Sequence, residues 1–263
     1  MTIIPQDRWV DSPGGRLFTR TWEPRQALCD IPIVLFHDSL GCVELWRSFP
    51  AALCAATQQR VIAYDRLGYG RSEACTSPPA FSFIEDEPTA SFAALYTAFQ
   101  LDRFIALGHS VGGGMAVHCA GHYADQCIGL VTIAAQSINE LRTRRGIEEA
   151  QAAFQIPEQF AKLEKYHGDK ASWVLHAWTD TWLHPAFETW SLKPALERVN
   201  CPTLVLHGEK DEYGSHRQPE QIARYTHGPV HCEILPGIHH VPHREAEAMV
   251  IIFISQFVAR LGL

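Results

Sequence analysis

A serine flanked by glycines is the feature of this sequence best suited to covalent chemistry: Gly-His-Ser-Val-Gly at 108–112. The apolar run 104–107 precedes it and a stretch rich in small residues follows it, which predicts a sharp turn from a strand into a helix. Such a turn lifts the Ser110 hydroxyl above the sheet and strains its backbone by about 1–3 kcal/mol. Glycine on both sides lets the strand and the helix approach each other. Ser110 is therefore the candidate nucleophile.

A serine nucleophile needs a base within hydrogen-bond reach and an acid that orients the base. When the serine lies on a strand-to-helix turn of this kind, the acid follows it in the sequence and the histidine comes last. Three acids follow the apolar run 203–206, namely Glu209, Asp211 and Glu212. Loops at the carboxyl ends of parallel strands face the ligand. We take Asp211 as the best candidate, ahead of Glu209 and Glu212.

Three histidines follow the last apolar strand: His239, His240 and His243. The base must reach the hydroxyl of the nucleophile in order to take up its proton. Position in this loop does not by itself distinguish the three histidines. Each of them remains a candidate base at this stage.

Apolar runs alternate with amphipathic stretches along the chain, which predicts an α/β fold. Strands are expected at eight places, the first two forming a hairpin: 8–10, 17–21, 31–36, 60–64, 104–107, 128–134, 203–206 and 230–235. Helices are expected at 46–56, 89–99, 111–123, 218–225 and 244–258. Alternating strands and helices imply right-handed crossovers and a mostly parallel sheet.

The strand pattern disappears between residues 136 and 192, where helical patterns rich in Glu, Gln, Lys and Trp replace it. We interpret 136–192 as a helical lid inserted into a core made of 1–135 and 193–263. Trp178 and Trp182 are one helical turn apart and should share a face, which would give a bound substrate an apolar roof. The alternative, which we favour for most aromatic rings of the lid, is that they pack the lid onto the core.

Composition indicates a globular protein with a sizeable core, since 46% of the 263 residues are apolar and 19% are charged. The formal net charge of −7, without runs of like charge, argues against nucleic acid and anionic membranes as partners. The eight cysteines form no CxxC pair and the histidines show no HExxH-like spacing, so we expect free thiols and no metal. No signal-peptide pattern or bilayer-spanning run is recognised, and the expected location is the cytoplasm.

Taken together, the motifs resemble those of α/β-hydrolase fold proteins of the lid-bearing esterase and C–C hydrolase type. The likeness covers nearly the whole chain outside the lid. The matching segments are the nucleophile elbow at 108–112, Asp-x-x-Gly-x-Gly-x-Ser at 65–72, His-Gly-x-x-Asp at 207–211 and the histidine loop at 236–242. The resemblance implies a mostly parallel eight-stranded sheet flanked by helices, the acid role for Asp211 and the base role for His240. His239 stands where the family commonly has glycine.

The loop expected to bind the oxyanion departs from the pattern of the family. The usual His-Gly-x-x-Gly is replaced by His-Asp-Ser-Leu-Gly at 37–41. By position, the backbone N–H groups of Ser39 and Val111 would bind the oxyanion, each donor worth about 2.7–4 kcal/mol in a protease. The hydroxyl of Ser39 could add a third hydrogen bond. A carboxylate at Asp38 would oppose a developing oxyanion unless it is paired or points away, and we expect it to face outward and cap the loop.

These features together predict a serine hydrolase with the triad Ser110, Asp211 and His240, acting on a small to medium, largely apolar ester or related acyl substrate. A serine in the nucleophile position excludes the acidic-nucleophile branches of the fold, the dehalogenases and epoxide hydrolases. The alternatives with the same triad are a C–C bond hydrolase of ring-cleavage products and a cofactor-free perhydrolase. A non-catalytic ligand-binding protein is a further alternative. No cofactor is implied, the expected partner is a small-molecule substrate, and the sequence does not indicate the oligomeric state.

Overall fold

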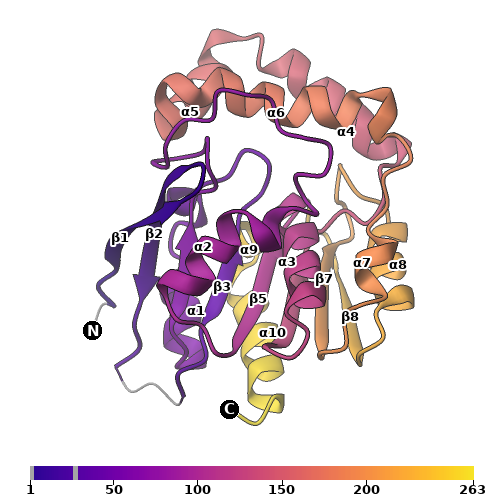
Figure 1. The fold of residues 1–263 in the computed structure, drawn as a ribbon. Coiled ribbons are helices and arrows are strands. Elements are labelled where there is room, and N and C mark those ends of the chain that lie inside the picture. The colour runs from indigo at the N-terminus through magenta and orange to yellow at the C-terminus, as the bar shows by residue number, and fades with distance from the viewer. Residues whose placement is uncertain (1–2, 26–28) are drawn as a thin grey trace.

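A computed structural model describes residues 3–25 and 29–263, and strands and helices alternate along them (Figure 1). Within these residues the sheet has eight strands in the order β1-β2-β4-β3-β5-β6-β7-β8. Their bounds are Gln6–Ser12 (β1), Gly15–Trp22 (β2), Ile33–Phe36 (β3), Val61–Tyr64 (β4), Phe104–His109 (β5), Cys127–Ile133 (β6), Thr203–Gly208 (β7) and Val230–Leu235 (β8). The pairs β1–β2 and β2–β4 are antiparallel and the others are parallel. The expected mostly parallel sheet is confirmed.

The α-helices begin and end close to the expected positions in the core. Their bounds are Phe49–Thr57 (α1), Ser91–Ala98 (α2), Val111–His122 (α3), Leu141–Ala153 (α4), Pro157–His167 (α5), Ala171–Leu183 (α6), Lys193–Leu196 (α7), Arg217–Tyr225 (α8), Pro242–Glu245 (α9) and Glu247–Arg260 (α10). The helix expected at 46–56 begins only at Phe49, because a 3-10 turn occupies Val43–Trp46.

The helix expected at 244–258 is confirmed as α10 over most of its length, but residues 244 and 245 belong to the separate short helix α9. Ala246, at φ −139° and ψ 47°, separates α9 from α10. The two helices pack against different parts of the protein. Helix α9 places the His243 ring 4.8 Å from the Trp46 ring, whereas α10 packs along α1. Amphipathic periodicity does not reveal the break because both pieces have apolar positions at helical spacing.

Helices cover both faces of the sheet, which explains the uninterrupted apolar strands. Along β3, Val34 and Phe36 belong to one hydrophobic cluster, while Ile33 and Leu35 belong to the other. The first cluster includes residues of α2 and α3, and the second includes residues of α1 and α10. Successive strand residues point to opposite faces. A strand between two helical layers therefore needs apolar residues at every position.

Between β6 and β7 the chain forms helices, with an isolated antiparallel bridge between Ile138 and Ser191. Figure 1 shows α4, α5 and α6 lying above the sheet, beyond one end of its strands. This helical segment is hydrogen-bonded to the core at separate places. Arg142 of α4 donates to the Asp211 carbonyl at 2.9 Å, and Lys170, next to α6, donates to the Gly70 carbonyl at 2.7 Å.

The expectations drawn from composition concern membranes, thiols and metals. No helix in the described part of the chain has the length and apolar character needed to cross a membrane. Each of the eight cysteines is a free thiol. Over residues 3–25 and 29–263, no group of three or more His, Cys, Asp or Glu side chains is arranged to hold a metal ion.

Candidate active site

Ser110 lies on a sharp turn between β5 and α3. Its φ of 56° and ψ of −124° are rare for a residue with a side chain. The flanking glycines are required by close contacts: a Cβ atom on Gly108 would lie 2.0 Å from the Gly112 carbonyl oxygen, and one on Gly112 would lie 2.1 Å from that of Phe36. The N–H of Ser110 donates to the Ile133 carbonyl at 2.9 Å. The neighbouring strands therefore hold the strained turn in place.

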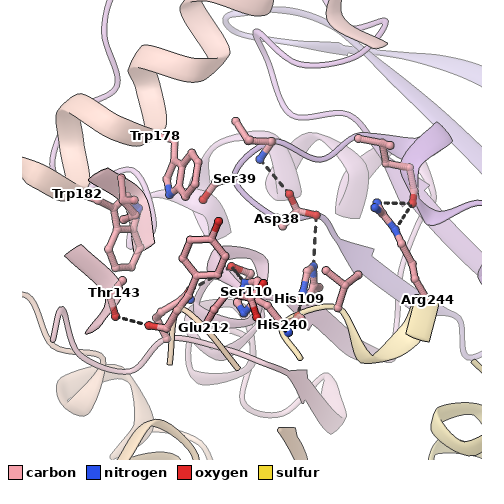
Figure 2. A pocket seen from close by; sticks show the side chains of 16 residues that line it. Asp38, Ser39, His109, Ser110, Thr143, Trp178, Trp182, Glu212, His240 and Arg244 are labelled. Carbon is pink, nitrogen blue, oxygen red and sulfur yellow. Dashed lines mark hydrogen bonds and ion pairs between the residues drawn. The ribbon is translucent and has the colours of Figure 1, made fainter. Parts of the chain in front are cut away.

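Three side chains from separate loops form a chain of hydrogen bonds at this turn, and Figure 2 shows two of them, Ser110 and His240. The His240 Nε2 atom lies 3.0 Å from Ser110 Oγ. The His240 Nδ1 atom lies 2.9 and 3.0 Å from the two carboxylate oxygens of Asp211. The three residues expose 6% (Ser110), 8% (His240) and 1% (Asp211) of their surface. The structure thus brings together the residues that the sequence selects, within the distances that proton transfer requires.

Charge interactions adjust the proton affinity of the base and the acid. Burial acts to lower the pKa of His240, but the Asp211 carboxylate outweighs it by charge and hydrogen bonding, and the pKa of His240 is raised. Burial also acts to raise the pKa of Asp211, but attraction to His240 and the hydrogen bonds it accepts leave that pKa lowered. Asp211 is therefore ionised at neutral pH, and it stabilises the protonated form of His240.

The remaining acids and histidines of the two loops have other surroundings. Glu209 is exposed and accepts a backbone N–H at 2.7 Å. Glu212 lines the cavity edge and accepts the N–H of His240 at 3.2 Å. His239 is exposed and pairs with a carboxylate 3.0 Å away, whereas His243 is buried among aromatic rings. Neither histidine is hydrogen-bonded to Ser110, so the choice of His240 rests on contacts as well as on resemblance.

Backbone and side-chain donors fix the acid loop. Asp211 Oδ1 accepts the N–H groups of Tyr213 at 2.8 Å and Gly214 at 2.9 Å. From the helical segment, Thr143 donates to the Tyr213 carbonyl at 2.7 Å. Arg142 donates to the carbonyl of Asp211, as described above. Helix α4 therefore helps to set the position of the acid that orients His240.

The loop after β3 is held by Arg66, which follows β4. The guanidinium of Arg66 donates to the carbonyls of His37 at 2.6 Å and Asp38 at 3.0 Å. Among the described residues, the backbone N–H groups of Ser39 and Val111 donate to no other protein group. Val111 directly follows Ser110, and Ser39 lines the cavity beside it. Their N–H groups are available to a ligand, as an oxyanion site requires.

The expectation that Asp38 faces outward is wrong, although its role in capping the loop is confirmed. Its Oδ1 atom accepts the N–H of Leu40 at 2.9 Å. Its side chain lines the cavity beside Ser110, and Oδ2 lies 3.3 Å from the Nδ1 atom of His109 (Figure 2). The buried ring of His109 supplies a partner that a solvent-facing carboxylate would not need. The sequence could not reveal this contact because the two residues are 71 positions apart.

A cavity of about 270 Å³ opens above Ser110. Its lining includes both tryptophans selected from the sequence, Trp178 and Trp182, which project from α6. Trp182 exposes only 2% of its surface and also packs against the Trp190 ring at 5.3 Å. Trp178 packs against Tyr213 at 5.9 Å. The shared face of α6 is confirmed, and both rings combine lining with packing.

Gln136, which follows β6, received no role from the sequence. It exposes 5% of its surface, and its Oε1 atom lies 3.1 Å from Ser110 Oγ. A serine hydroxyl donates one hydrogen bond at a time. Gln136 is therefore a second acceptor for the proton that would otherwise go to His240. Its place at the carboxyl end of a parallel strand is the signal that marks it as a residue near the site, but that signal does not reveal its contact with Ser110.

The fold and this site define the family. A model described as the alpha/beta hydrolase family matches residues 33–251. The chain therefore belongs to the alpha/beta hydrolase family, as its motifs indicate, and the protein is a hydrolase.

The similar proteins cover several activities. The non-heme chloroperoxidase of Streptomyces lividans is 25% identical over 233 residues, which are 76% of this chain and 80% of that protein. The (lyso)-N-acylphosphatidylethanolamine lipase of Mus musculus is 31% identical over 127 residues, but the match spans 48% of this chain and 36% of the lipase. The proline iminopeptidase of Mycobacterium smegmatis has a TM-score of 0.74 at 20% identity, covering 97% of this chain and 98% of its own. At that identity the likeness shows the shared fold.

Proposed function

We propose that the protein is a serine hydrolase that transfers an acyl group to water through Ser110. The observation that carries the proposal is His240, hydrogen-bonded to Ser110 at 3.0 Å and to Asp211 at 2.9 Å inside a cavity. His240 takes the Ser110 proton while Oγ attacks the substrate carbonyl carbon, and then gives that proton to the leaving group. His240 next takes a proton from water, whose oxygen attacks the acyl-serine carbonyl carbon. The bond from that carbon to Ser110 Oγ then breaks, His240 returns the proton to Oγ, and the acid is released.

The oxyanion formed in both steps needs donors close to Ser110. Val111 follows the serine at the start of α3, and Ser39 lies in the loop after β3. Their N–H groups have no other protein acceptor among the described residues. In this proposal, the N–H groups of Ser39 and Val111 bind the substrate oxygen, and no metal or organic cofactor takes part.

The size and lining of the cavity support a small to medium, largely apolar acyl group or ester. Ile147, Trp178 and Trp182 supply apolar surface from α4 and α6. We propose that residues 136–192, which lie in the sequence between the two parts of the core, form a lid over the site. Its hydrogen bonds to the acid loop through Arg142 and to a core loop through Lys170 support a lid that stays in place.

Replacing the nucleophile tests this proposal. Ser110→Ala is expected to abolish hydrolysis of a short p-nitrophenyl ester and labelling by a fluorophosphonate probe, because no other group replaces Oγ. Folding is checked by the circular dichroism spectrum and the melting temperature. Within the same loop, His240→Ala should lose activity, whereas His239→Ala should keep it, since His239 is exposed and does not contact Ser110. Labelling or turnover that persists in Ser110→Ala would refute the assignment.

A second candidate is favoured by the likeness to the chloroperoxidase. In this perhydrolase reaction, hydrogen peroxide replaces water as the attacking group and the acyl-serine is released as a peracid, with the same residues in the same roles. Peracid formation from an acetate ester and hydrogen peroxide, compared between the wild-type protein and Ser110→Ala, distinguishes the two candidates. Vinylogous keto acids assayed in the same series test C–C bond hydrolysis.

A further inference from the structure

Asp38 and His109 are in contact beside Ser110, and the proposed reaction does not use this contact. Asp38 Oδ2 lies 3.3 Å from His109 Nδ1, while Oδ1 accepts the N–H of Leu40 (Figure 2). The other ring nitrogen of His109, Nε2, lies 2.8 Å from the carbonyl oxygen of His240. The ring of His109 thus connects two loops: the oxyanion loop, residues 37–41, and the base loop, residues 236–242.

These contacts require one proton more than a neutral histidine carries. A carbonyl oxygen only accepts hydrogen bonds, so the Nε2 atom of His109 must carry hydrogen. A neutral imidazole has one ring N–H, which leaves a lone pair on Nδ1 facing the Asp38 carboxylate. An additional proton, held between Asp38 Oδ2 and His109 Nδ1, converts this repulsion into a hydrogen bond. Asp38 and His109 with this proton have no net charge.

The charged and titratable neighbours of the pair favour this arrangement. Burial acts to raise the pKa of Asp38, but the hydrogen bond and charge of His109, together with Arg244 and His37, leave it lowered. The His243 ring lies 4.6 Å from His109, but burial holds the pKa of His243 well below its usual value, so that ring is neutral near pH 7. The His240 ring lies 5.1 Å from His109. Asp38 is therefore the anion that His109 contacts.

We propose that Asp38 and His109 are positioning residues whose shared proton holds the oxyanion loop against the base loop. The contact keeps the N–H of Ser39 directed at the substrate carbonyl oxygen and the ring of His240 directed at Ser110 Oγ. It also neutralises the carboxylate that stands where related sequences have glycine, so that no unpaired negative charge faces the oxyanion. This inference rests on the proposed function, because it describes how the same site is held.

Two substitutions at Asp38 distinguish the effect of losing its hydrogen bonds from the effect of losing the shared proton. In Asp38→Asn, the amide oxygen can still accept from Leu40 and the amide N–H can donate to neutral His109, so both contacts remain without the extra proton. Asp38→Ala removes both contacts. Loss of one oxyanion donor costs about 10²–10³ in kcat in a protease. We expect Asp38→Ala to lower kcat by about 10- to 100-fold with little change in KM, and Asp38→Asn to retain most of kcat.

The pH profile is the measurement that a merely structural role would not change. The test measures kcat/KM of a p-nitrophenyl ester from about pH 5 to pH 10 in the wild-type protein and in Asp38→Asn. The two profiles should differ, because the amide N–H of Asp38→Asn replaces the shared proton. Asp102→Asn makes the same change of charge at an exposed position before β5 and should keep the wild-type profile.

Fluorophosphonate labelling of Ser110 separates this inference from the proposed function. If Ser110 of the wild-type protein is not labelled, the proposed function fails and the inference fails with it. If Ser110 is labelled, two results would overturn the inference alone: a pH profile of Asp38→Asn that matches the wild-type profile, or wild-type kcat in Asp38→Ala. Asp38→Asn keeps the test decisive if Asp38→Ala does not fold.

Discussion

At the residue scale, the histidines around the cavity differ in what their ring nitrogens contact. His240 lies between a hydroxyl and a carboxylate, so it can accept a proton and pass it on. His109 lies between a carbonyl and a carboxylate, so it can hold a proton but has no substrate-facing partner. His243 has no partner for Nδ1 among the described residues and packs against Trp46. In the proposed mechanism, the same residue type therefore serves proton transfer, positioning and packing within one site.

The pH dependence of the base is predicted from its contact with Asp211. Because His240 must be neutral to act as a base and its pKa is raised, the acid limb of kcat/KM should lie above the ordinary histidine value of about 6.5. Asp211→Asn removes the carboxylate and should move this limb to lower pH while lowering kcat by about 10⁴, as in a serine protease. Profiles of kcat/KM for both proteins check this. An acid limb that stays in place in Asp211→Asn would contradict the role of Asp211.

At the scale of elements, the position of Ser110 depends on how closely α3 approaches β3. Gly112 in the first turn of α3 lies against the backbone of Phe36, the last residue of β3. Gly114, two positions after Gly112 in α3, faces a side chain instead. The atom nearest to a Cβ added at Gly114 is Ile84 Cγ2, at 3.2 Å. The two glycines therefore differ in whether their neighbour can move.

This difference predicts opposite outcomes for the same substitution. Gly112→Ala would place Cβ 2.1 Å from the Phe36 carbonyl oxygen, and we expect it to lower the free energy of unfolding by at least about 1–3 kcal/mol and to displace Ser110. Gly114→Ala lies in the same helix against a side chain, which needs to shift by only a few tenths of an ångström, and should be neutral, or stabilising by up to about 1 kcal/mol. Denaturant unfolding of both variants checks this. Equal stabilities would contradict the close approach.

At the scale of the whole molecule, the fold buries polar groups that do not line the cavity. Glu87 is 3% exposed and accepts a hydrogen bond from the Tyr64 hydroxyl at 2.6 Å. Burial raises the pKa of Glu87 from its usual 4.5 to about 7. Burial also raises the pKa of the Asp65 carboxyl, in the loop after β4, to about 6. Both groups link the stability of the fold to pH.

The sign of this linkage follows from the direction of the shift. The folded state holds the Glu87 proton more tightly than the unfolded state, so its contribution is full below pH 4.5 and declines until about pH 7. The decline is about 3 kcal/mol. Glu87→Gln should remove this part of the decline and be more stable than the wild-type protein above pH 7, measured by urea unfolding across the pH range. The exposed neighbour Glu85→Gln serves as control, and the same pH dependence in Glu87→Gln would refute the assignment.

The sequence alone determined the order of the elements and of the reactive residues. Apolar runs such as 31–36 and 203–206 report strands buried on both faces, because each residue of such a strand must be apolar. The glycines around Ser110 report a close backbone contact that only glycine permits. The order of serine, acid and histidine reports the crossover topology. Each of these signals comes from a local requirement on consecutive residues.

Only the tertiary structure decided which side chains meet. The sequence could not show that Asp38 turns inward to His109, that Gln136 reaches Ser110, or that the last helix divides at Ala246. These features depend on contacts between residues distant in the chain, whose geometry is set by the packing of loops at the carboxyl edge of the sheet. Local patterns carry no record of such contacts, because a carboxylate or an amide is equally compatible with solvent until its partner is in place.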